Sequence, residues 1–132
     1  MRNFRNPAIY FIAMALFALA ACKKSSSGLT VQLNAADSNK TINIVNGERI
    51  LITLVNPGDG GFSFDNWQYN SSVLKLVSHT HNTPANSDKI GDFGSDTWQF
   101  SALANGTSAM KITATRGSAY VITMFHDTIQ VQ

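Results

Sequence analysis

The sequence predicts an all-β domain over residues 29–132, built as a two-layer sandwich or a small barrel. No stretch after Gly28 keeps an apolar period of about 3.6 residues for three turns, which argues against long helices. Short β-forming runs recur instead, separated by Asn, Gly, Asp and Pro. Apolar residues alternate with others inside these runs, as at Ile50, Ile52 and Leu54. The length of 132 residues suits one domain.

Each run is interpreted in order as one strand. Asn46-Gly47 and Asn105-Gly106 predict tight turns between neighbouring runs, because Asn and Gly tolerate the positive φ that both central residues of a hairpin turn need. The large side chains expected to anchor the core are Phe62, Phe64, Trp67, Trp98 and Phe100. The expected strands span residues 29–33, 41–45, 49–55, 62–69, 73–80, 97–103, 108–115, 119–125 and 128–131.

Residues 1–21 have the organisation of a secretory signal peptide. Arg2 and Arg5 precede an apolar run that is shorter than the ~20 residues needed to span a bilayer. The run ends at Leu19-Ala20-Ala21-Cys22, which resembles the lipobox of bacterial lipoproteins. That resemblance implies cleavage before Cys22 and acylation of its thiol and new amino group, and several acyl chains anchor a protein stably. An ordinary signal peptide with an incidental cysteine is the alternative.

Residues 22–28 are expected to form the acylated cysteine and a flexible polar tether, Lys23-Lys24-Ser25-Ser26-Ser27-Gly28. Lys23, in place of Asp, resembles the second residue of lipoproteins sent to the outer membrane. An acidic run of the kind that marks export to the cell surface is missing. The expected location is therefore the outer membrane, with the domain on its periplasmic face.

Charge and cysteine content exclude several classes of function. The chain has 10 Lys and Arg against 8 Asp and Glu, a formal net charge of +2. Without the signal peptide and the tether lysines the folded part carries 6 against 8, a formal charge of about −2, which does not favour nucleic-acid binding. The single cysteine excludes an intramolecular disulfide and any multi-cysteine metal cluster.

No motif in the sequence predicts catalysis or a metal centre. His79 and His81 share one face of an extended chain and His126 could join them as metal ligands, but exposed histidines at a strand end are the favoured interpretation. Asp92 and Asp96 could form a carboxylate pair, yet no nucleophile lies near them in sequence. We therefore expect a protein without enzymatic activity and without a cofactor.

Three short segments resemble, in order, the loops of the chagasin-type inhibitors of papain-like cysteine proteases. Asn56-Pro57 follows a strand pair and precedes Phe62 and Phe64, as the family's Asn-Pro-Thr-Thr-Gly loop does. Gly91-Asp92-Phe93-Gly94 stands where the family has Gly-x-Gly-Gly, and Arg116 stands at the family's Arg-Pro-aromatic loop. The resemblance covers roughly residues 40–132 and implies an immunoglobulin-like β-sandwich.

The resemblance also implies that the chain, a monomer, blocks the active-site cleft of a papain-like cysteine protease with three adjacent loops. Gly58-Asp59 replaces Thr-Thr, Phe93 replaces one glycine, and Gly117-Ser118 replaces the Pro-aromatic pair. Phe93 could supply the missing apolar contact and Arg116 charge-assisted hydrogen bonds. The implied protease-binding residues are Asn56, Pro57, Gly58, Asp59, Gly60 and Gly61 in the first loop, Gly91, Asp92, Phe93 and Gly94 in the second, and Arg116, Gly117 and Ser118 in the third.

Two questions stay open at the level of sequence. Residues 119–125 are strongly β-forming, although the family resemblance places a loop there, so either a strand after a tight Gly117-Ser118 hairpin or a longer loop is compatible with them. The second question is function. The chain is a membrane-anchored protease inhibitor, or it is an immunoglobulin-like binding or structural module of a bacterial envelope lipoprotein that no longer inhibits.

Overall fold

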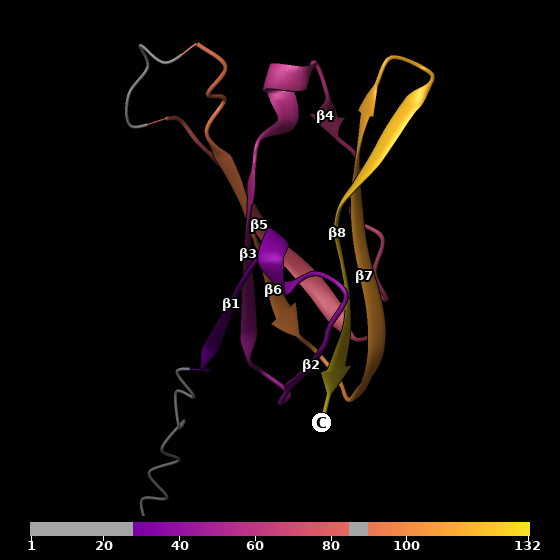
Figure 1. Cartoon of the computed structure of the whole chain (residues 1–132). Helices are drawn as coiled ribbons and strands as arrows, with labels where there is room; N and C mark the ends of the chain where they lie inside the picture. The colour runs from indigo at the N-terminus through magenta and orange to yellow at the C-terminus, as the bar shows by residue number, and fades with distance from the viewer. Residues whose placement is uncertain (1–27, 85–89) are drawn as a thin grey trace, which may run out of the picture.

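The computed structural model describes residues 28–84 and 90–132, which form two four-stranded sheets packed face to face (Figure 1). This architecture confirms the predicted all-β class and, of the two alternatives, the sandwich. The predicted signal peptide, Cys22 and the tether as far as Ser27 lie outside the described residues. Within the described ranges, no helix has the length and apolar content required to cross a bilayer.

Both sheets combine parallel and antiparallel strand pairs. β1 runs parallel to β3 and β2 runs parallel to β8, while the remaining neighbours are antiparallel. One sheet has the order β1 (Thr30–Asn34), β3 (Arg49–Val55), β6 (Ser95–Ala102), β5 (Leu74–Asn82). The other has the order β2 (Thr41–Ile44), β8 (Tyr120–Val131), β7 (Gly106–Arg116), β4 (Ser63–Phe64). Two 3₁₀ turns, η1 (Ala35–Asp37) and η2 (Pro57–Gly60), complete the fold.

The core lies between the sheets, where alternate residues of each strand point inward. In β6 every second side chain is buried, among them Trp98 and Phe100. Trp67 packs edge-on against Trp98, Phe100 and Phe125, with ring centroids 5.7, 5.3 and 5.8 Å away. The buried apolar residues are Leu33, Ile44, Ile50, Ile52, Leu54, Val73, Leu74, Trp98, Phe100, Ala102, Met110, Ile112, Phe125, Ile129 and Val131.

The strand predicted over residues 62–69 is mostly absent, and Phe62 is not a core residue. Only Ser63 and Phe64 pair with β7, followed by a single bridge between Gln68 and Lys111. Phe64 and Trp67 both pack against the core although they are three residues apart, whereas inward residues of a regular strand are an even number apart. The chain therefore leaves the ladder after Phe64, and Phe62 lies outside the core at the end of the sandwich.

Residues 119–125 are strand, so the ambiguity is resolved in favour of a long hairpin. β8 is continuous over 120–131, and the break that we expected before residue 128 is wrong. It pairs with β7 from Arg116↔Tyr120 to Gly106↔Val131. The register shifts once, between Ile112 and Thr113, and the buried Asp127 accepts a hydrogen bond from the Lys40 backbone N–H at 2.8 Å.

Asn46-Gly47 forms the predicted tight turn, closed by the Glu48 N–H donating to the Val45 carbonyl oxygen at 3.1 Å, but neither Asn-Gly pair joins two strands of one hairpin. β2 and β3 belong to different sheets, as do β6 and β7, so the chain crosses between layers at both positions. Of the residues in the first turn, only Gly47 has positive φ, at 87°. A type I′ turn would need positive φ at Asn46 as well.

Both ends of the described chain lie at one pole of the sandwich. Gly28 is close to Gly47 in the β2–β3 turn, and the Gln132 backbone bonds to Ile44 and Asn46. β3 starts at this pole and ends at Val55, at the opposite pole, where the predicted binding loops lie (Figure 1).

Candidate functional site

The structure brings the three predicted loops together at one pole of the sandwich. We call this region the loop end and define it as the first loop (56–61), the second loop (91–94) and the third loop (116–118). The Asn56 N–H donates to the Gly94 carbonyl oxygen at 2.9 Å, which joins the first and second loops. Arg116 Nη1 donates to the Gly60 carbonyl oxygen at 3.2 Å, which joins the first and third.

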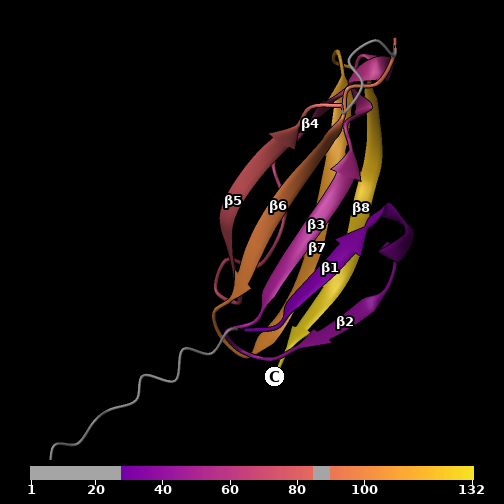
Figure 2. The same cartoon turned by 90° about the vertical axis from the view of Figure 1, so that its left-hand side faces the viewer.

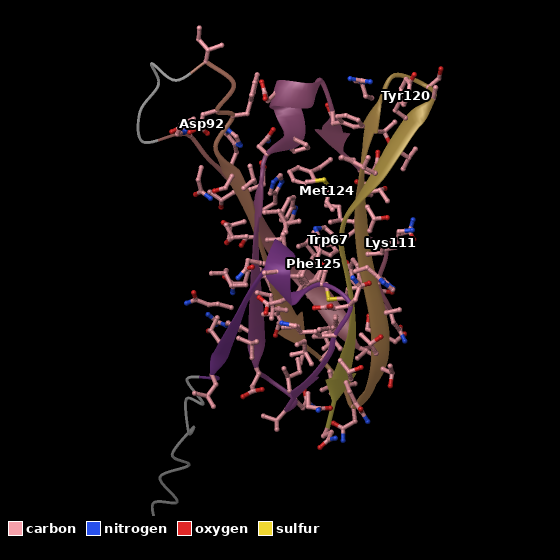
Figure 3. All side chains as sticks on the ribbon, viewed as in Figure 1. Trp67, Asp92, Lys111, Tyr120, Met124 and Phe125 are labelled. Carbon is pink, nitrogen blue, oxygen red and sulfur yellow. The ribbon has the colours of Figure 1, made fainter. Side chains whose placement is uncertain are left out.

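The loop end is broad in one direction and thin in the other. In Figure 1 the second loop, η2 and the β7–β8 turn spread across the width of the molecule, in that order. After a quarter turn (Figure 2) the same segments gather into a narrow row above the strands. Figure 3 shows Asp92 and Tyr120 on either side of η2. The loops therefore form a thin edge rather than a flat face.

The first loop is a capped 3₁₀ turn rather than an extended segment. Asn56 is its N-cap, with Oδ1 accepting from the Gly58 N–H at 2.9 Å, and Pro57 is the first residue of the turn. Gly61 ends it, with its N–H donating to the carbonyl oxygens of Gly58 and Pro57. The cap satisfies an N–H that the start of a short helix otherwise leaves free, so this conformation is fixed locally.

The second loop packs on the first through Phe93 and Asp59. A Cβ at Gly58 would come within 2.7 Å of the Phe93 ring, so the ring rests directly on the Gly58 backbone. The Asp59 carboxylate lies against Gly91 in the same way.

Gly94 closes the second loop next to β5. Its φ is 75°, and a Cβ there would collide with the carbonyl oxygen of Asn82. The Gly94 N–H donates to Asp92 Oδ1 at 2.9 Å, so the Asp92 carboxylate is used inside the loop. Asp92 and Asp96 therefore have separate partners, and the carboxylate pair considered from the sequence does not form.

In the third loop, Gly117 and Ser118 make the turn of the β7–β8 hairpin, and Arg116 contacts two aromatic rings. The guanidinium carbon lies 5.0 Å from the centroid of Phe62 and 4.8 Å from that of Tyr120. These cation–π contacts connect the end of the first loop to the hairpin. Sequence reasoning expected Arg116 to hydrogen-bond to a partner, but in this structure its guanidinium already contacts Gly60, Phe62 and Tyr120.

Below the first loop, Asp96 is buried, with 4% of its surface exposed, and three side chains donate to its carboxylate. Asn56 Nδ2 lies 2.6 Å from Oδ2, His79 Nε2 lies 2.7 Å from Oδ1, and His81 Nδ1 lies 3.2 Å from Oδ2. Sequence reasoning missed this cluster. The sequence did hold one signal for it. Alternate residues of a strand face the same side, and Asp96 is two residues before Trp98 in β6, so it faces inward with Trp98.

The hydrogen bonds to Asp96 decide its charge. Burial by itself raises the pKa of this carboxyl, but the bonds from Asn56, His79 and His81 outweigh burial and hold the pKa below its ordinary value. Asp96 is therefore ionised at neutral pH. His79 also stacks on Trp98, with ring centroids 4.7 Å apart and an interplanar angle of 6°.

His79 and His81 thus have a structural partner. His126 lies elsewhere, beside Ser38 and Asn39. Across residues 28–84 and 90–132, no three His, Cys, Asp or Glu side chains are grouped so as to hold a metal ion.

Apolar side chains surround the loop end. A shallow hollow between the first and second loops is lined by Phe62, Phe64 and Phe93 together with His79 and Asp96. Tyr120 and the two residues after it are exposed on the neighbouring β7–β8 hairpin. The large hydrophobic side chains exposed at this pole are Val55, Ile90, Phe93, Tyr120, Val121 and Ile122.

Comparison with known proteins agrees with the fold. Residues 43–129 match the family model described as "Chagasin family peptidase inhibitor I42". The chain is similar in structure to the cysteine protease inhibitor EhICP2 from Entamoeba histolytica, with a TM-score of 0.65, 18% identity, and coverage of 78% of this chain and 96% of that one. It is also similar to amebosin, with a TM-score of 0.52, 20% identity, and coverage of 80% and 100%. No curated protein sequence matches the chain.

Proposed function

Because the chain belongs to the chagasin family of peptidase inhibitors, we propose that it inhibits papain-like cysteine proteases by inserting the three loops of the loop end into the active-site cleft. Members of this family are peptidase inhibitors and not enzymes. The two similar structures support the fold, and the loop end supports the mode of binding.

The single observation that carries this proposal is the mutual support of the three loops. Asn56 bonds to Gly94, Phe93 rests on Gly58, and Arg116 bonds to Gly60, so each loop is held by another. Ordering a loop at the moment of binding costs about 0.5–1.5 kcal/mol for each immobilised side chain. Loops that are already fixed side by side avoid much of that cost, and a thin edge has the shape to enter a cleft.

Exposed apolar side chains supply the binding energy in this proposal. Phe93, on the second loop, is 49% exposed, and Tyr120, beside the third loop, is 59% exposed. Aromatic residues of this kind dominate the energetics of tight interfaces when they enter desolvated pockets. Tyr120 follows Arg116 by four residues and supplies an aromatic ring near the position where the family has its Pro-aromatic pair.

The loop conformations also explain how the chain would resist cleavage. A protease cuts a segment that it binds in an extended form with the scissile carbonyl at the nucleophile. The first loop is instead closed by the Asn56 cap and by the bonds of the Gly61 N–H. Opening it would break these bonds together with those to Gly94 and Arg116.

We further propose that the inhibitor is attached to the bacterial outer membrane through acyl chains on Cys22, with the domain on the periplasmic side. The lipobox-like Leu19-Ala20-Ala21-Cys22 and the polar segment after it support this proposal. Metabolic labelling with a palmitate analogue tests it. The label is expected in the native protein and absent from Cys22→Ser, and a labelled Cys22→Ser would contradict the proposal.

Inhibition assays test the proposed function. Residues 28–132 contain all the strands and core residues that the structure describes, so this fragment is assayed against a panel of papain-like proteases. We expect reversible nanomolar inhibition, and Phe93→Ala is expected to weaken it by about tenfold or more. Leu103→Ala is the matched control, because Leu103 is exposed to a similar degree, 47%, at the opposite pole.

A non-inhibitory binding or structural module is the second candidate. The observation in its favour is that the Arg116 guanidinium is already occupied by Gly60, Phe62 and Tyr120. Lack of inhibition across the panel at tens of micromolar, by a fragment with a cooperative melting curve, would favour this candidate over the inhibitor.

A further inference from the structure

Asp96 lies beneath the loop end, and its carboxylate contacts the first loop at one residue only, Asn56. It belongs to β6, where it pairs in register with Leu54 of β3 and His81 of β5. Its position is therefore set by three strands of one sheet. Because it is almost fully buried, it is not available to contact a protease directly.

Asn56 transmits the position of Asp96 to two loops. Its side-chain amide has a donor end, Nδ2, and an acceptor end, Oδ1. Nδ2 donates to Asp96 at 2.6 Å, and Oδ1 accepts from the Gly58 N–H at 2.9 Å. Its backbone N–H donates to Gly94 in the second loop.

A carboxylate accepts hydrogen bonds and does not donate them. Asp96 therefore fixes which end of the Asn56 amide points down into the sheet, and so which end points up at Gly58. With the amide reversed, Oδ1 would face a negative charge and Nδ2 would face the Gly58 N–H, and both contacts would be lost.

We propose that Asp96 is a positioning residue for the loop end, holding Asn56 in the one amide orientation that caps the first loop and bonds to the second. That the loop end binds a protease rests on the proposed function. The effect of Asp96 on the order of the loops does not, because it can be measured on the protein alone.

His79 and His81, both from β5, are the titratable groups that face Asp96, and Asn56 from the end of β3 is neutral. The Asp96 carboxylate accepts a hydrogen bond from each of these three side chains and offers a donor to none of them.

Asp96→Asn separates this role from general packing, since it keeps the shape of the side chain. An Asn side chain at position 96 carries a donor, Nδ2, as well as an acceptor, Oδ1, so it no longer selects which end of the Asn56 amide faces it. The variant is therefore expected to lose part of the order of the first loop.

Hydrogen exchange on the full-length chain in mild detergent measures this effect in the absence of any protease. For peptides covering residues 56–61, exchange in Asp96→Asn is expected to be about 10- to 100-fold faster than in the parent at the same pH. Asp65→Asn is the matched control, because Asp65 also accepts two side-chain hydrogen bonds, from Thr113 and Thr115, but is not bonded to the first loop.

Inhibition of papain by the same proteins gives the second measurement. Inhibition by Asp96→Asn is expected to be weakened by a similar factor, and inhibition by Asp65→Asn to resemble that of the parent. Unchanged exchange of residues 56–61 in Asp96→Asn overturns the positioning role, whatever the inhibition shows. Faster exchange in a protein that inhibits no protease supports the positioning role and rejects the proposed function.

Asn56→Ala removes the amide and leaves Asp96 in place, which covers the case in which Asp96→Asn fails to fold. It is expected to accelerate exchange of residues 56–61 as Asp96→Asn does. Exchange at the parental rate in Asn56→Ala would overturn the proposal.

Discussion

Replacing Arg116 by Gln is expected to loosen the connection between the first loop and the β7–β8 hairpin. The guanidinium lies 5.0 Å from the Phe62 centroid and 4.8 Å from the Tyr120 centroid, and it donates to Gly60. At an exposed site each cation–π contact contributes about 0.5–1 kcal/mol, so two rings give about 1–2 kcal/mol. The exposed hydrogen bond adds little, because water replaces it. The free energy of unfolding is expected to fall by about 1–2 kcal/mol.

A double-mutant cycle in urea measures the Tyr120 part of this value. The cycle compares the parent, Arg116→Gln, Tyr120→Leu and the double variant. A coupling free energy of about 0.5–1 kcal/mol is expected between the two sites. Lys75→Gln, which removes a cation from β5, serves as the control and is expected to be additive with Tyr120→Leu. If the effects of Arg116→Gln and Tyr120→Leu add to within about 0.3 kcal/mol, the contact between the Arg116 guanidinium and the Tyr120 ring does not stabilise the fold.

The same substitution links loop order to inhibition. A hairpin that is free to move must be ordered when the protease binds, so Arg116→Gln is expected to weaken inhibition by about tenfold, mostly through faster dissociation. An unchanged dissociation rate in a measurably destabilised variant would show that the Arg116 contacts support the fold but not the binding edge.

Three other predictions concern the core and the loops. Trp98→Ala is expected to lower the free energy of unfolding, measured in urea, by about 3–5 kcal/mol, because it leaves a cavity among Phe64, Trp67 and His79. A melting temperature within a degree or two of the parent would show that Trp98 is not a core residue. Gly94→Ala is expected to displace the second loop, given its positive φ and the nearby Asn82 carbonyl, and to weaken inhibition while the sheets persist; undiminished inhibition would contradict this. Burial raises the pKa of Asp127, so the native state is most favoured while this carboxyl is protonated and loses stability as the pH rises through that raised pKa. The free energy of unfolding of Asp127→Asn, relative to that of the parent, should therefore increase between pH 4 and 7. If this difference stays constant with pH, ionisation of Asp127 does not destabilise the native state.

The sequence predicted strands best where apolar alternation was regular. The range 49–55 was correct at both ends, since Ile50, Ile52 and Leu54 all face the core. The strand predicted over 62–69 was wrong. Phe64 and Trp67 both pack against the core but are an odd number of residues apart, because the chain leaves the β-ladder between them. Sheet membership was also beyond local patterns: Asn46-Gly47 has the composition of a hairpin turn, but β2 and β3 find their partners far away in sequence.

The candidate site was predicted in part. Short motifs in a fixed order identified the three loops, and a two-layer fold placed them at one pole. The Asp96 cluster was missed because its members are separated by up to 40 residues and meet only through the register of β3, β5 and β6. His79 and His81 were recognised as sharing a face of one strand, but the group that they face is supplied by another.

The polarity of the sandwich has a practical consequence. Gly28 and Gln132 are both at the pole opposite the loop end, so a handle fused at either point leaves the loops unobstructed. Immobilising the protein by its C-terminus on a sensor chip would present Phe93 and Tyr120 to a protease in the flow. The proposed lipid at Cys22 would likewise be attached on the Gly28 side of the domain, at the pole away from the edge that meets a diffusing enzyme.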